Sequence, residues 1–344
     1  MAGSGGHWKT LEEAQKLTQS LLIPKVMEED IKRGNLIEKL PVAQAANSGK
    51  SIKWNREKTT LESAVEEVAI GGQLSWTEDV EYDEMETELK RCYIQRKLDK
   101  FVEAIYGNIN NYEAQILLEC KKGMLRKLGD KIFYDDITYG STLQFDGLHA
   151  LAALEVGTDL DIDMAHAGLQ LAKLRILTDT MKHGIDLLVF PYCIARHLDA
   201  AYHERGLVLQ NANLLGMMSY EKDAVGKRIS VWDNIPILRS DYLVAEQQDT
   251  GKGTNARAKY SSGNKMYSIF AIKFGQIMEG EPGLCYAYGG TEGAGDFYKL
   301  DLFDKLEDYD AKGMRLVNYS ALLLGSSMCV GRIHDIADSA IVIS

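Results

Sequence analysis

Residues 50–100 constrain the fold of this chain more than any other stretch. Polar residues alternate with apolar or aromatic ones across 52–56 and again across 89–93, which is the pattern of two β-strands. Between them lies a long polar segment with Gly71-Gly72 and the acidic run EDVEYDEMETE. Two strands so far apart form an extended ribbon instead of a tight hairpin. An isolated ribbon is only marginally stable in water, so it needs a surface to lie on.

The rest of the sequence offers this ribbon no obvious cover, which favours contact with a partner molecule. The first forty residues present a similar question. A capping box at Thr10 and Glu13 precedes apolar residues at helical spacing, and Pro24 and Pro41 divide the region. This N-terminal part is either an ordinary helical subdomain or an arm that packs on a neighbouring subunit.

Hydrophobic periodicity predicts three further helices. The first spans 111–128 and ends at Gly129, a residue that suits the left-handed conformation found after many helices. The second spans 159–184 with Asp163 as its cap, and the third spans Cys193–Glu204. The apolar stripe of the second helix consists of Met164, Ala167, Leu171, Leu174, Leu177 and Met181.

Strand patterns dominate the second half of the chain. They cover IDLLVF, the region 226–244, SIFAIKF, GLCYAYG, FYKLDLF and parts of the apolar C-terminal segment 313–344. The glycine-rich loop 249–265 interrupts them and is expected to be flexible. This mixture of helices and strands predicts an α+β chain.

Composition limits the classes of function. The 344 residues suffice for about two domains, and 45% of them are apolar. No run of 18 apolar residues occurs, so no membrane-spanning segment is expected, and the N-terminus lacks the pattern of a secretory signal. The five cysteines are scattered without a C-x-x-C pair, so reduced thiols are expected. A net charge of −11 disfavours direct binding of nucleic acid, although an acidic chain can still enclose DNA.

Gly49-Lys50-Ser51 matches the end of a phosphate-binding loop. That loop begins with a glycine five residues before Gly49, and this position is Gln44. The residues that follow alternate like a strand and do not open a helix. The sequence therefore excludes a nucleotide-binding loop at this place.

The acidic run DLDID resembles the start of a calcium-binding loop, with Asp159, Asp161 and Asp163 at alternate positions. Met164 stands where the loop requires glycine, and Gln170 stands where it requires glutamate. Capping of a helix by Asp163, with Asp161 stabilised by the helix dipole, explains the run more simply.

The remaining motifs give no better site. The glycines of YGGTEGAGDF have the reverse of the spacing of a dinucleotide-binding loop. His197 and His203 would point about 120° apart on a helix, and the pair His334-Asp335 near two serines does not establish a catalytic triad. We therefore predict no catalytic, cofactor-binding or metal-binding residue, and no enzymatic activity.

Several stretches, taken in order, resemble the major capsid protein of tailed bacteriophages, whose fold is shared with encapsulins and the herpesvirus capsid floor. GNLIEKLPVAQAANSGKSIKWNREKTTLESAVEEV resembles the N-terminal arm passing into the extended loop, and FDGLHAL resembles the segment after the spine helix. IDLLVFPYCIARHLDAA resembles the axial-domain strand and helix. GKRISVWDNIPILRSDYL resembles a strand pair, with Asn234 in place of the usual glycine, and GMRLVNYSALLLGSSMCVGRI resembles the closing segment. The resemblance covers nearly the whole chain from about residue 20.

This resemblance implies an α+β fold with an N-terminal arm, an extended β-hairpin loop, a spine helix, a peripheral domain and an axial domain. The implied boundaries are 1–48 for the arm, 49–100 for the extended loop, 101–155 for the peripheral domain with the spine helix, 156–312 for the axial domain and 313–344 for the return to the peripheral domain.

The resemblance also implies a function. Copies of the chain would assemble as hexamers and pentamers into an icosahedral shell around the double-stranded DNA of a tailed phage, without catalysis, cofactor, metal or membrane. Further implied partners are a scaffolding protein supplied separately, a portal and a decoration protein, and the DNA is enclosed without sequence-specific contact. The implied location is the virion, after assembly in the host cytoplasm. The alternatives are an encapsulin-type compartment and an enzyme of unknown chemistry.

Contacts between subunits are expected along the ribbon and at the loop 249–265, which would approach a symmetry axis. The expected contact residues are Trp54, Arg56, Glu66, Glu67, Trp76, Lys252, Arg257 and Lys259. The tip of the extended loop, EEVAIGGQLSW, contains no lysine, so autocatalytic cross-linking between subunits is not expected.

Overall fold

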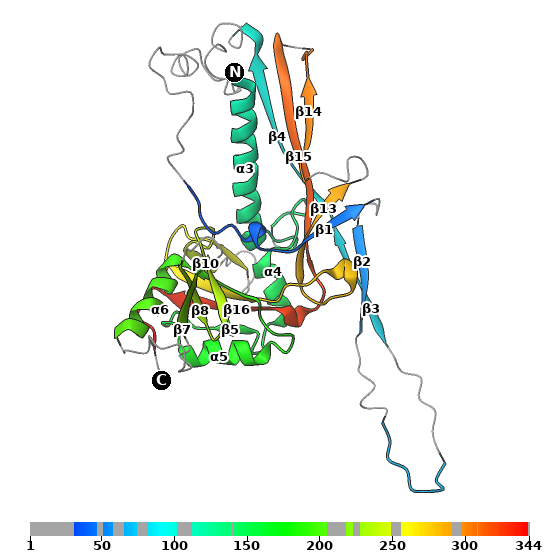
Figure 1. Cartoon of the computed structure of the whole chain (residues 1–344), viewed down its shortest axis with the longest axis vertical. Coiled ribbons are helices and arrows are strands. Elements are labelled where there is room, and N and C mark those ends of the chain that lie inside the picture. The colour runs from blue at the N-terminus through cyan, green and yellow to red at the C-terminus, as the bar shows by residue number, and fades with distance from the viewer. Residues whose placement is uncertain are drawn as a thin grey trace.

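Across the residues that the structure describes, the computed structural model shows a mixed α+β chain built on two β-sheets of five and nine strands and a separate two-stranded ribbon. In Figure 1 the longest helix, α3 (Tyr112–Tyr134), runs beside the elongated five-stranded sheet, and the nine-stranded sheet lies below it with further helices. The ribbon projects away from both sheets. The described residues are 31–46, 51–57, 65–73, 81–101, 112–138, 140–204, 218–222, 228–248, 256–290, 297–307 and 309–342.

The five-stranded sheet is long because β15 (Ala311–Leu324) runs along its whole length. On one side, β4 (Lys90–Asp99) pairs with residues 311–320 of β15. On the other side, β14 (Lys299–Phe303) and β13 (Leu284–Gly290) pair with successive parts of β15. At the edge, β1 (Val42–Ala46) pairs in parallel with β13.

One face of this sheet is covered by α3. The buried residues of α3 recur every four positions, so they share one side of the helix, and they pack against the inward-facing side chains of β4 and β15. The buried cluster includes Ile116, Cys120, Met124 and Leu128 of α3, and Leu98, Met314 and Leu316 of the sheet.

The predicted helix 111–128 is confirmed, but its predicted end at Gly129 is wrong because α3 continues to Tyr134. A β-carbon at Gly129 would lie 2.7 Å from the ring of Tyr242 and 2.9 Å from the side-chain oxygen of Asn35. Glycine at this position therefore serves close packing inside the helix and does not end it.

The nine-stranded sheet is the larger of the two. Its main path runs β11–β10–β12–β6–β9–β8–β7, while β16 pairs with β12 and with β5. The strands are β5 (Asp161–Asp163), β6 (Leu187–Pro191), β7 (Met218–Lys222), β8 (Arg228–Trp232), β9 (Ile235–Ser240), β10 (Glu246–Gln248), β11 (Arg257–Lys259), β12 (Met266–Ile272) and β16 (Val330–Ala337).

The two faces of this sheet belong to different cores. Successive side chains of a strand point to opposite faces, so Val189 of β6 packs in the cluster with α3, while Phe190 packs in a second cluster. Two helices, α5 (Leu171–Thr180) and α6 (Tyr192–Glu204), contribute their apolar sides to that second cluster. Both faces of the central strands are therefore buried, which explains the uninterrupted apolar run LLVF of β6.

The strands predicted in the second half of the chain are confirmed: IDLLVF is β6, SIFAIKF lies in β12, GLCYAYG in β13 and FYKLDLF in β14. The region 226–244 holds β8 and β9, the C-terminal segment holds β16 and most of β15, and the helix predicted at Cys193–Glu204 is α6. The remaining short elements are α4 (Leu148–Ala152), η1 (Leu36–Glu38), η3 (Ala153–Glu155), η4 (Ile277–Glu279) and η5 (Ser327–Cys329).

The long helix predicted over 159–184 is wrong in its first half. Residues 161–163 form β5, which pairs in parallel with β16, and α5 begins only at Leu171. Asp163 therefore does not cap the helix. Asp161 is paired with the guanidinium of Arg332 on β16. This pairing holds residues 161–163 in a strand although the local sequence has a helical pattern.

The ribbon has a different second strand from the one predicted. β2 (Ser51–Glu57) pairs antiparallel with β3 (Tyr82–Glu88), so the acidic run from Tyr82 onward is a strand and not part of a polar tip. The strand predicted at 89–93 exists as part of β4, but it pairs with β15. The run YDEMETE can form a strand because three of its carboxylates lie on one face and remain solvated.

Part of the segment that lacked obvious cover is packed inside its own chain. β1 buries Ala43 and Ala45 beside β13, and Ile52 at the base of the ribbon joins the same cluster. Among the described residues of this segment, the outer part of the ribbon and the exposed residues 65–73 are the parts that still lack cover. The helices predicted within residues 1–30 lie outside the described residues.

The predicted domain boundaries stay predictions. Within the described residues, both 156–312 and 313–344 contribute strands to both sheets. The helix pair α5 and α6 lies with the nine-stranded sheet, and α3 lies against both sheets.

Candidate functional site

The ribbon carries two chemically different faces. Its register places Ile52, Trp54 and Met85 on one face, and the first two of these contact the buried cluster at the ribbon's base. The opposite face, called the acidic face below, consists of Lys53, Glu57, Glu84, Glu86 and Glu88. Lys53 hydrogen-bonds to Glu84 and lies 3.7 Å from Glu86, and Lys90 lies 2.7 Å from Glu88, so two cations partly offset four carboxylates.

Residues 65–73 are exposed throughout and lie at the far end of the extended segment from the body (Figure 1). Val65 and Ile70 are exposed apolar residues, with relative exposures of 78% and 109%. Glu66 and Glu67, two of the expected contact residues, lie between them and are exposed as well. Apolar side chains gathered on a projecting segment are typical of a surface that another molecule covers.

The outer face of the five-stranded sheet, opposite α3, is basic. Because Cys92 and Ile94 pack toward α3, the alternate residues of β4 point outward. The register places outward residues of β15 and β14 beside them. The cations of this face, called the basic strip below, are Arg91, Lys97, Lys299 and Arg315.

Three cations of the basic strip each lie against an aromatic ring. The guanidinium of Arg91 lies 5.7 Å from the ring centre of Tyr93, and that of Arg315 lies 5.1 Å from the ring of Phe303. Lys97 lies over the ring of Tyr309. Such cation–π contacts fix the positive groups on a surface whose register also places two carboxylates there, Asp99 and Asp301.

Trp54 and Arg56 line a groove of about 790 Å³ at the base of the ribbon. The indole nitrogen of Trp54 is buried without a hydrogen-bond partner, and Arg56 lies 3.9 Å from Asp83 across the ribbon. The other side of the groove is formed by residues 280–282 and 325–328. Both residues therefore lie beside a concave surface, and their contact with another subunit stays a prediction.

The remaining expected contact residues have varied positions. Lys259 is paired with Asp130 at 3.0 Å and is half exposed. Arg257 is buried and already paired inside its own subunit with Asp335. Trp76 and Lys252 lie outside the described residues, and contacts between subunits at all of these positions stay predictions.

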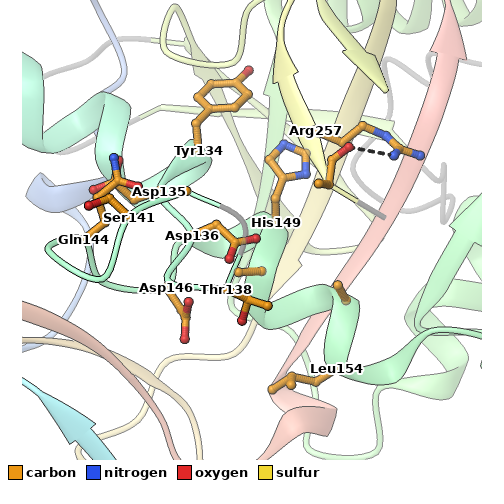
Figure 2. Close-up of a pocket in the computed structure, with 14 residues that line it drawn as sticks. Tyr134, Asp135, Asp136, Thr138, Ser141, Gln144, Asp146, His149, Leu154 and Arg257 are labelled. Atoms are coloured by element: carbon orange, nitrogen blue, oxygen red, sulfur yellow. Dashed lines mark hydrogen bonds between the residues drawn. The ribbon is translucent and has the colours of Figure 1, made fainter. Parts of the chain in front are cut away.

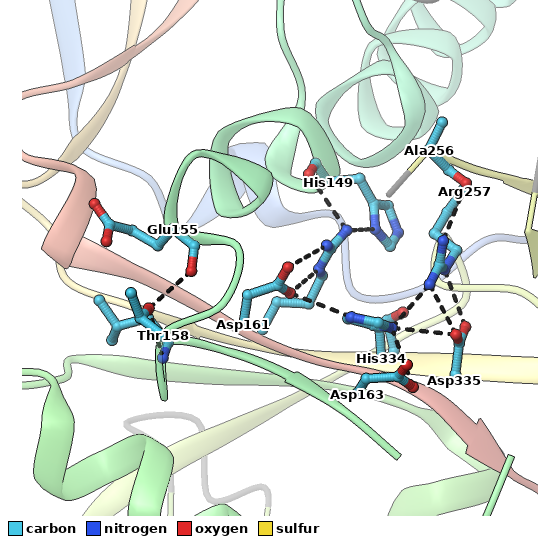
Figure 3. A network of polar contacts seen from close by, with 12 residues as sticks. His149, Glu155, Thr158, Asp161, Asp163, Ala256, Arg257, His334 and Asp335 are labelled. Carbon is cyan, nitrogen blue, oxygen red and sulfur yellow. Dashed lines mark hydrogen bonds and ion pairs between the residues drawn. The ribbon is translucent and has the colours of Figure 1, made fainter. Parts of the chain in front are cut away.

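A buried row of ionisable side chains crosses the subunit close to α4, as Figure 3 shows. Arg332 is fully buried and donates two hydrogen bonds, of 2.7 and 2.8 Å, to the carboxylate of Asp161. It also approaches Nδ1 of His149 at 3.2 Å, and Nε2 of His149 lies 3.0 Å from Glu246. The second half of the row joins Asp161 to His334, Arg257 and Asp335.

Burial and hydrogen bonding shift the pKa values in this row. Burial lowers the pKa of His149, and the neighbouring Arg332 acts in the same direction. Burial alone would raise the pKa of Glu246, but the electrostatic attraction of His149 and hydrogen bonds from His149, Ser268 and Tyr134 lower it overall. Burial and the nearby Glu246 raise the pKa of Tyr134 well above its ordinary value. At neutral pH these shifts favour a neutral imidazole, an ionised carboxylate and a protonated phenol.

The sequence alone indicates only some of the residues in this row. It singles out Asp161, Asp163 and the pair His334-Asp335, but not His149, Glu246 or Arg332. The sequence does hold one signal for Arg332, because a charged residue inside the apolar strand VGRIHDIA requires a buried partner.

Three of these residues, Asp163, His334 and Asp335, lie close enough together to hold a metal ion. The guanidinium of Arg257, however, lies 2.8 Å from Asp335 and 2.9 Å from Nδ1 of His334. A cation therefore already occupies the position between these groups, and a metal site does not fit this arrangement.

A polar pocket of about 490 Å³ adjoins the row. Figure 2 shows Asp136, Asp146 and His149 around it, and burial raises the pKa of Asp146. Both ring nitrogens of His149 are already engaged by Arg332 and Glu246. The ring is thus unavailable as a catalytic base, and the described residues of this pocket form no nucleophile–base pair.

Comparison with solved structures identifies the fold. The chain is similar to the SrpI encapsulin of Synechococcus elongatus, with a TM-score of 0.67 and 10% sequence identity over 98% of each chain. It is also similar to the capsid of an empty GTA particle, with a TM-score of 0.61 and 10% identity over 98% of each chain. The chain has the capsid fold of tailed phages and encapsulins.

A third similar structure of this capsid fold is the capsid of the Cyanophage P-SCSP1u, with a TM-score of 0.54 and 12% identity over 96% of this chain and 94% of that chain. No protein-family model and no curated protein sequence matches. The predicted α+β capsid fold is thereby confirmed, while the assignment of its separate domains stays a prediction. Among the described helices, none is both long and apolar enough to cross a membrane.

Proposed function

We propose that the chain is the structural subunit of an icosahedral shell that encloses the double-stranded DNA of a tailed phage. In this proposal, copies assemble as hexamers and pentamers and perform no catalysis. The observation that carries it is the capsid fold, which extends over 98% of the chain, including the projecting ribbon. The exposed ribbon supports it further, because such a segment needs a surface from another molecule.

The charge distribution supports a specific contact between copies. The acidic face of the ribbon and the basic strip are of opposite sign, and β4 and β15 carry the strip away from the ribbon toward the other end of the molecule (Figure 1). The distal cations Lys97, Lys299 and Arg315 are therefore placed to meet the ribbon of another copy more readily than their own. Single surface ion pairs contribute only about 0.2–1 kcal/mol. A shell subunit makes several contacts at once, however, and in a closed shell their free energies act together.

Charge reversal tests this contact. E84K/E86K on the ribbon and K97E/R315E on the sheet should each stop shell assembly, and the combined fourfold variant should restore it. D159K/D179K, which reverses two exposed carboxylates elsewhere, is the matched control and should still form shells. A combined variant as defective as its parents would contradict the ribbon–strip contact.

Negative-stain microscopy of the unmodified chain tests the shell itself. Closed particles are expected when the chain is produced with its scaffolding protein, and a chain that stays monomeric or dimeric under these conditions would contradict the proposed function. Uniform closed shells from the chain alone would instead remove the need for a scaffolding protein. The portal and decoration protein are further partners of this proposal, with assembly in the host cytoplasm and the virion as final location.

The second candidate is the shell of an encapsulin-type compartment, which the similarity to the SrpI encapsulin favours. The two functions differ in what the particle contains. Nuclease-protected double-stranded DNA inside purified particles supports the phage shell, and small particles filled with protein support the compartment. Neither outcome changes the structural role of the subunit.

A further inference from the structure

The buried row of ionisable groups has a regular order. It runs Glu246, His149, Arg332, Asp161, His334, Arg257 and Asp335, and is called the polar chain below. A carboxylate, an imidazole and a guanidinium follow one another, the same order repeats, and a third carboxylate ends the row. Figure 3 shows most of these contacts.

The polar chain joins elements that are remote in sequence. His149 lies on α4, whereas its partners lie on β10 and β16, 97 and 183 residues away. Arg332 contacts α4 twice, through Nδ1 of His149 at 3.2 Å and through the backbone oxygen of His149 at 3.4 Å. His149 is therefore the residue through which the polar chain holds α4 against β16.

The contacts of His149 fix its proton. A guanidinium can only donate hydrogen bonds, so Nδ1, which faces Arg332, must accept and carries no proton. Nε2 then carries the single ring proton and donates it to Glu246 at 3.0 Å. The closed arrangement thus requires a neutral imidazole.

We propose that the polar chain is an acid-sensitive latch, in which protonation of His149 at Nδ1 releases α4 from β16. The added proton turns an acceptor into a donor directly opposite the donor Nη1 of Arg332, and it places two cations 3.2 Å apart in a buried site. One of them has to move toward water, because a buried pair of like charges is strongly unfavourable.

The groups that face His149 support this direction. They are Glu246 from β10, Arg332 from β16, Arg257 from β11 and Tyr134 from α3. Two guanidiniums oppose the imidazolium and one carboxylate favours it. Together with burial they lower the pKa of His149 below its ordinary value of 6.5.

The sign of the pH effect follows from linkage. Below about pH 6.5 the released form binds a proton on His149 that the closed form does not bind, so the closed form loses stability as the pH falls. Asp335 also has a lowered pKa, so its contribution is lost in the same direction at still lower pH. Acid therefore opens the latch, and neutral pH closes it. Asp161, Asp163 and Arg257 surround the second imidazole, His334.

Hydrogen exchange at pH 7.5 and pH 5.5, corrected for the intrinsic effect of pH, tests the latch in the full chain. Exchange of the α4 amides should rise by about tenfold or more at pH 5.5, while that of the α6 amides should change little. H149Q removes the titrating ring and should make α4 exchange independent of pH. H197Q, at a partly exposed histidine paired with Asp338, is the matched control and should keep the wild-type response.

Two results would overturn the proposal: equal protection of α4 in the wild-type chain at both pH values, or an unchanged response in H149Q. Should H149Q fail to fold, an NMR titration of the histidines in the wild-type chain decides. The latch requires His149 to stay unprotonated in the closed form at pH 6.5. Protonation of His149 at or above that pH, with α4 still protected, contradicts it. Neither readout depends on shell assembly.

Discussion

At the scale of single residues, Arg332 has the most demanding environment. Its guanidinium is fully buried, and it donates two hydrogen bonds to the carboxylate of Asp161. A buried ion pair adds little net stability, but removing one partner leaves an uncompensated charge. The stability of the nine-stranded sheet therefore depends on keeping both groups.

D161N should lower the free energy of unfolding by about 3–5 kcal/mol, because the amide cannot neutralise the buried guanidinium of Arg332. Urea denaturation of the dissociated subunit measures the change. The matched control is D163N, two residues away on the same strand, whose side chain is 58% exposed and whose loss of charge should change stability by less than about 0.5 kcal/mol. Equal effects of the two substitutions would contradict this account of Arg332.

The two glycines inside α3 give a second prediction. A β-carbon at Gly123 meets no atom within 4 Å, whereas one at Gly129 meets the ring of Tyr242 at 2.7 Å. G123A should stabilise the subunit by about 0.5–1 kcal/mol through helix propensity, and G129A should destabilise it by about 1–3 kcal/mol through overpacking. Thermal unfolding of both variants checks the prediction, and a stabilising G129A would show that the Tyr242 ring moves aside at no cost.

The roles of some single residues could not be predicted from the sequence. A glycine after a helical stretch commonly ends the helix, and nothing near Gly129 in the sequence indicates Tyr242, which is 113 positions later. His149 and Glu246 are likewise isolated in the sequence and meet across 97 residues. Long-range partners decide the role of such residues, so local pattern alone could not reveal them.

At the scale of elements, a helix or strand was predicted correctly where the hydrophobic pattern agreed with its long-range contacts. β6 was predictable because both of its faces are buried, which leaves a short apolar run. The helix over 159–184 failed because the pairing of β5 with β16 competes with helical periodicity in its first half. The acidic strand β3 was missed because its charges lie on an exposed face, where a strand and a polar loop have the same composition.

The ribbon provides a prediction at this scale. M85P/E86P places proline at two adjacent residues of β3, and since successive residues alternate in donating to the partner strand, at least one ladder hydrogen bond is lost. The variant should no longer form shells, while thermal unfolding of the dissociated subunit should stay near that of the wild type. M85V/T87V, which changes side chains of β3 but keeps its backbone donors, serves as control and should still form shells. A large loss of subunit stability in M85P/E86P would show that the ribbon also supports the body.

At the scale of the whole molecule, two electrostatic effects of opposite sign act on assembly. Each copy carries a net charge of −11, so copies repel one another, and salt relieves this repulsion. The contact between the acidic face and the basic strip is attractive, and salt weakens it. The capsid fold was recognisable from the order of motifs, but this segregation of charge was not, because it depends on which strand residues share a face.

Salt dependence separates the two effects. The screening length for charges falls from about 10 Å at 0.1 M salt to about 3 Å at 1 M. The ribbon–strip contact should therefore contribute little to assembly at high salt. E84Q/E86Q lacks two carboxylates of the acidic face, and it should assemble less well than the wild type at 0.1 M and nearly equally at 1 M. D159N/D179N, which removes the same charge from exposed positions elsewhere, should follow the wild-type curve at a constant offset. Light scattering during assembly measures all three curves. If E84Q/E86Q also runs parallel to the wild type, net charge alone explains the salt effect and the ribbon makes no electrostatic contact with a second copy.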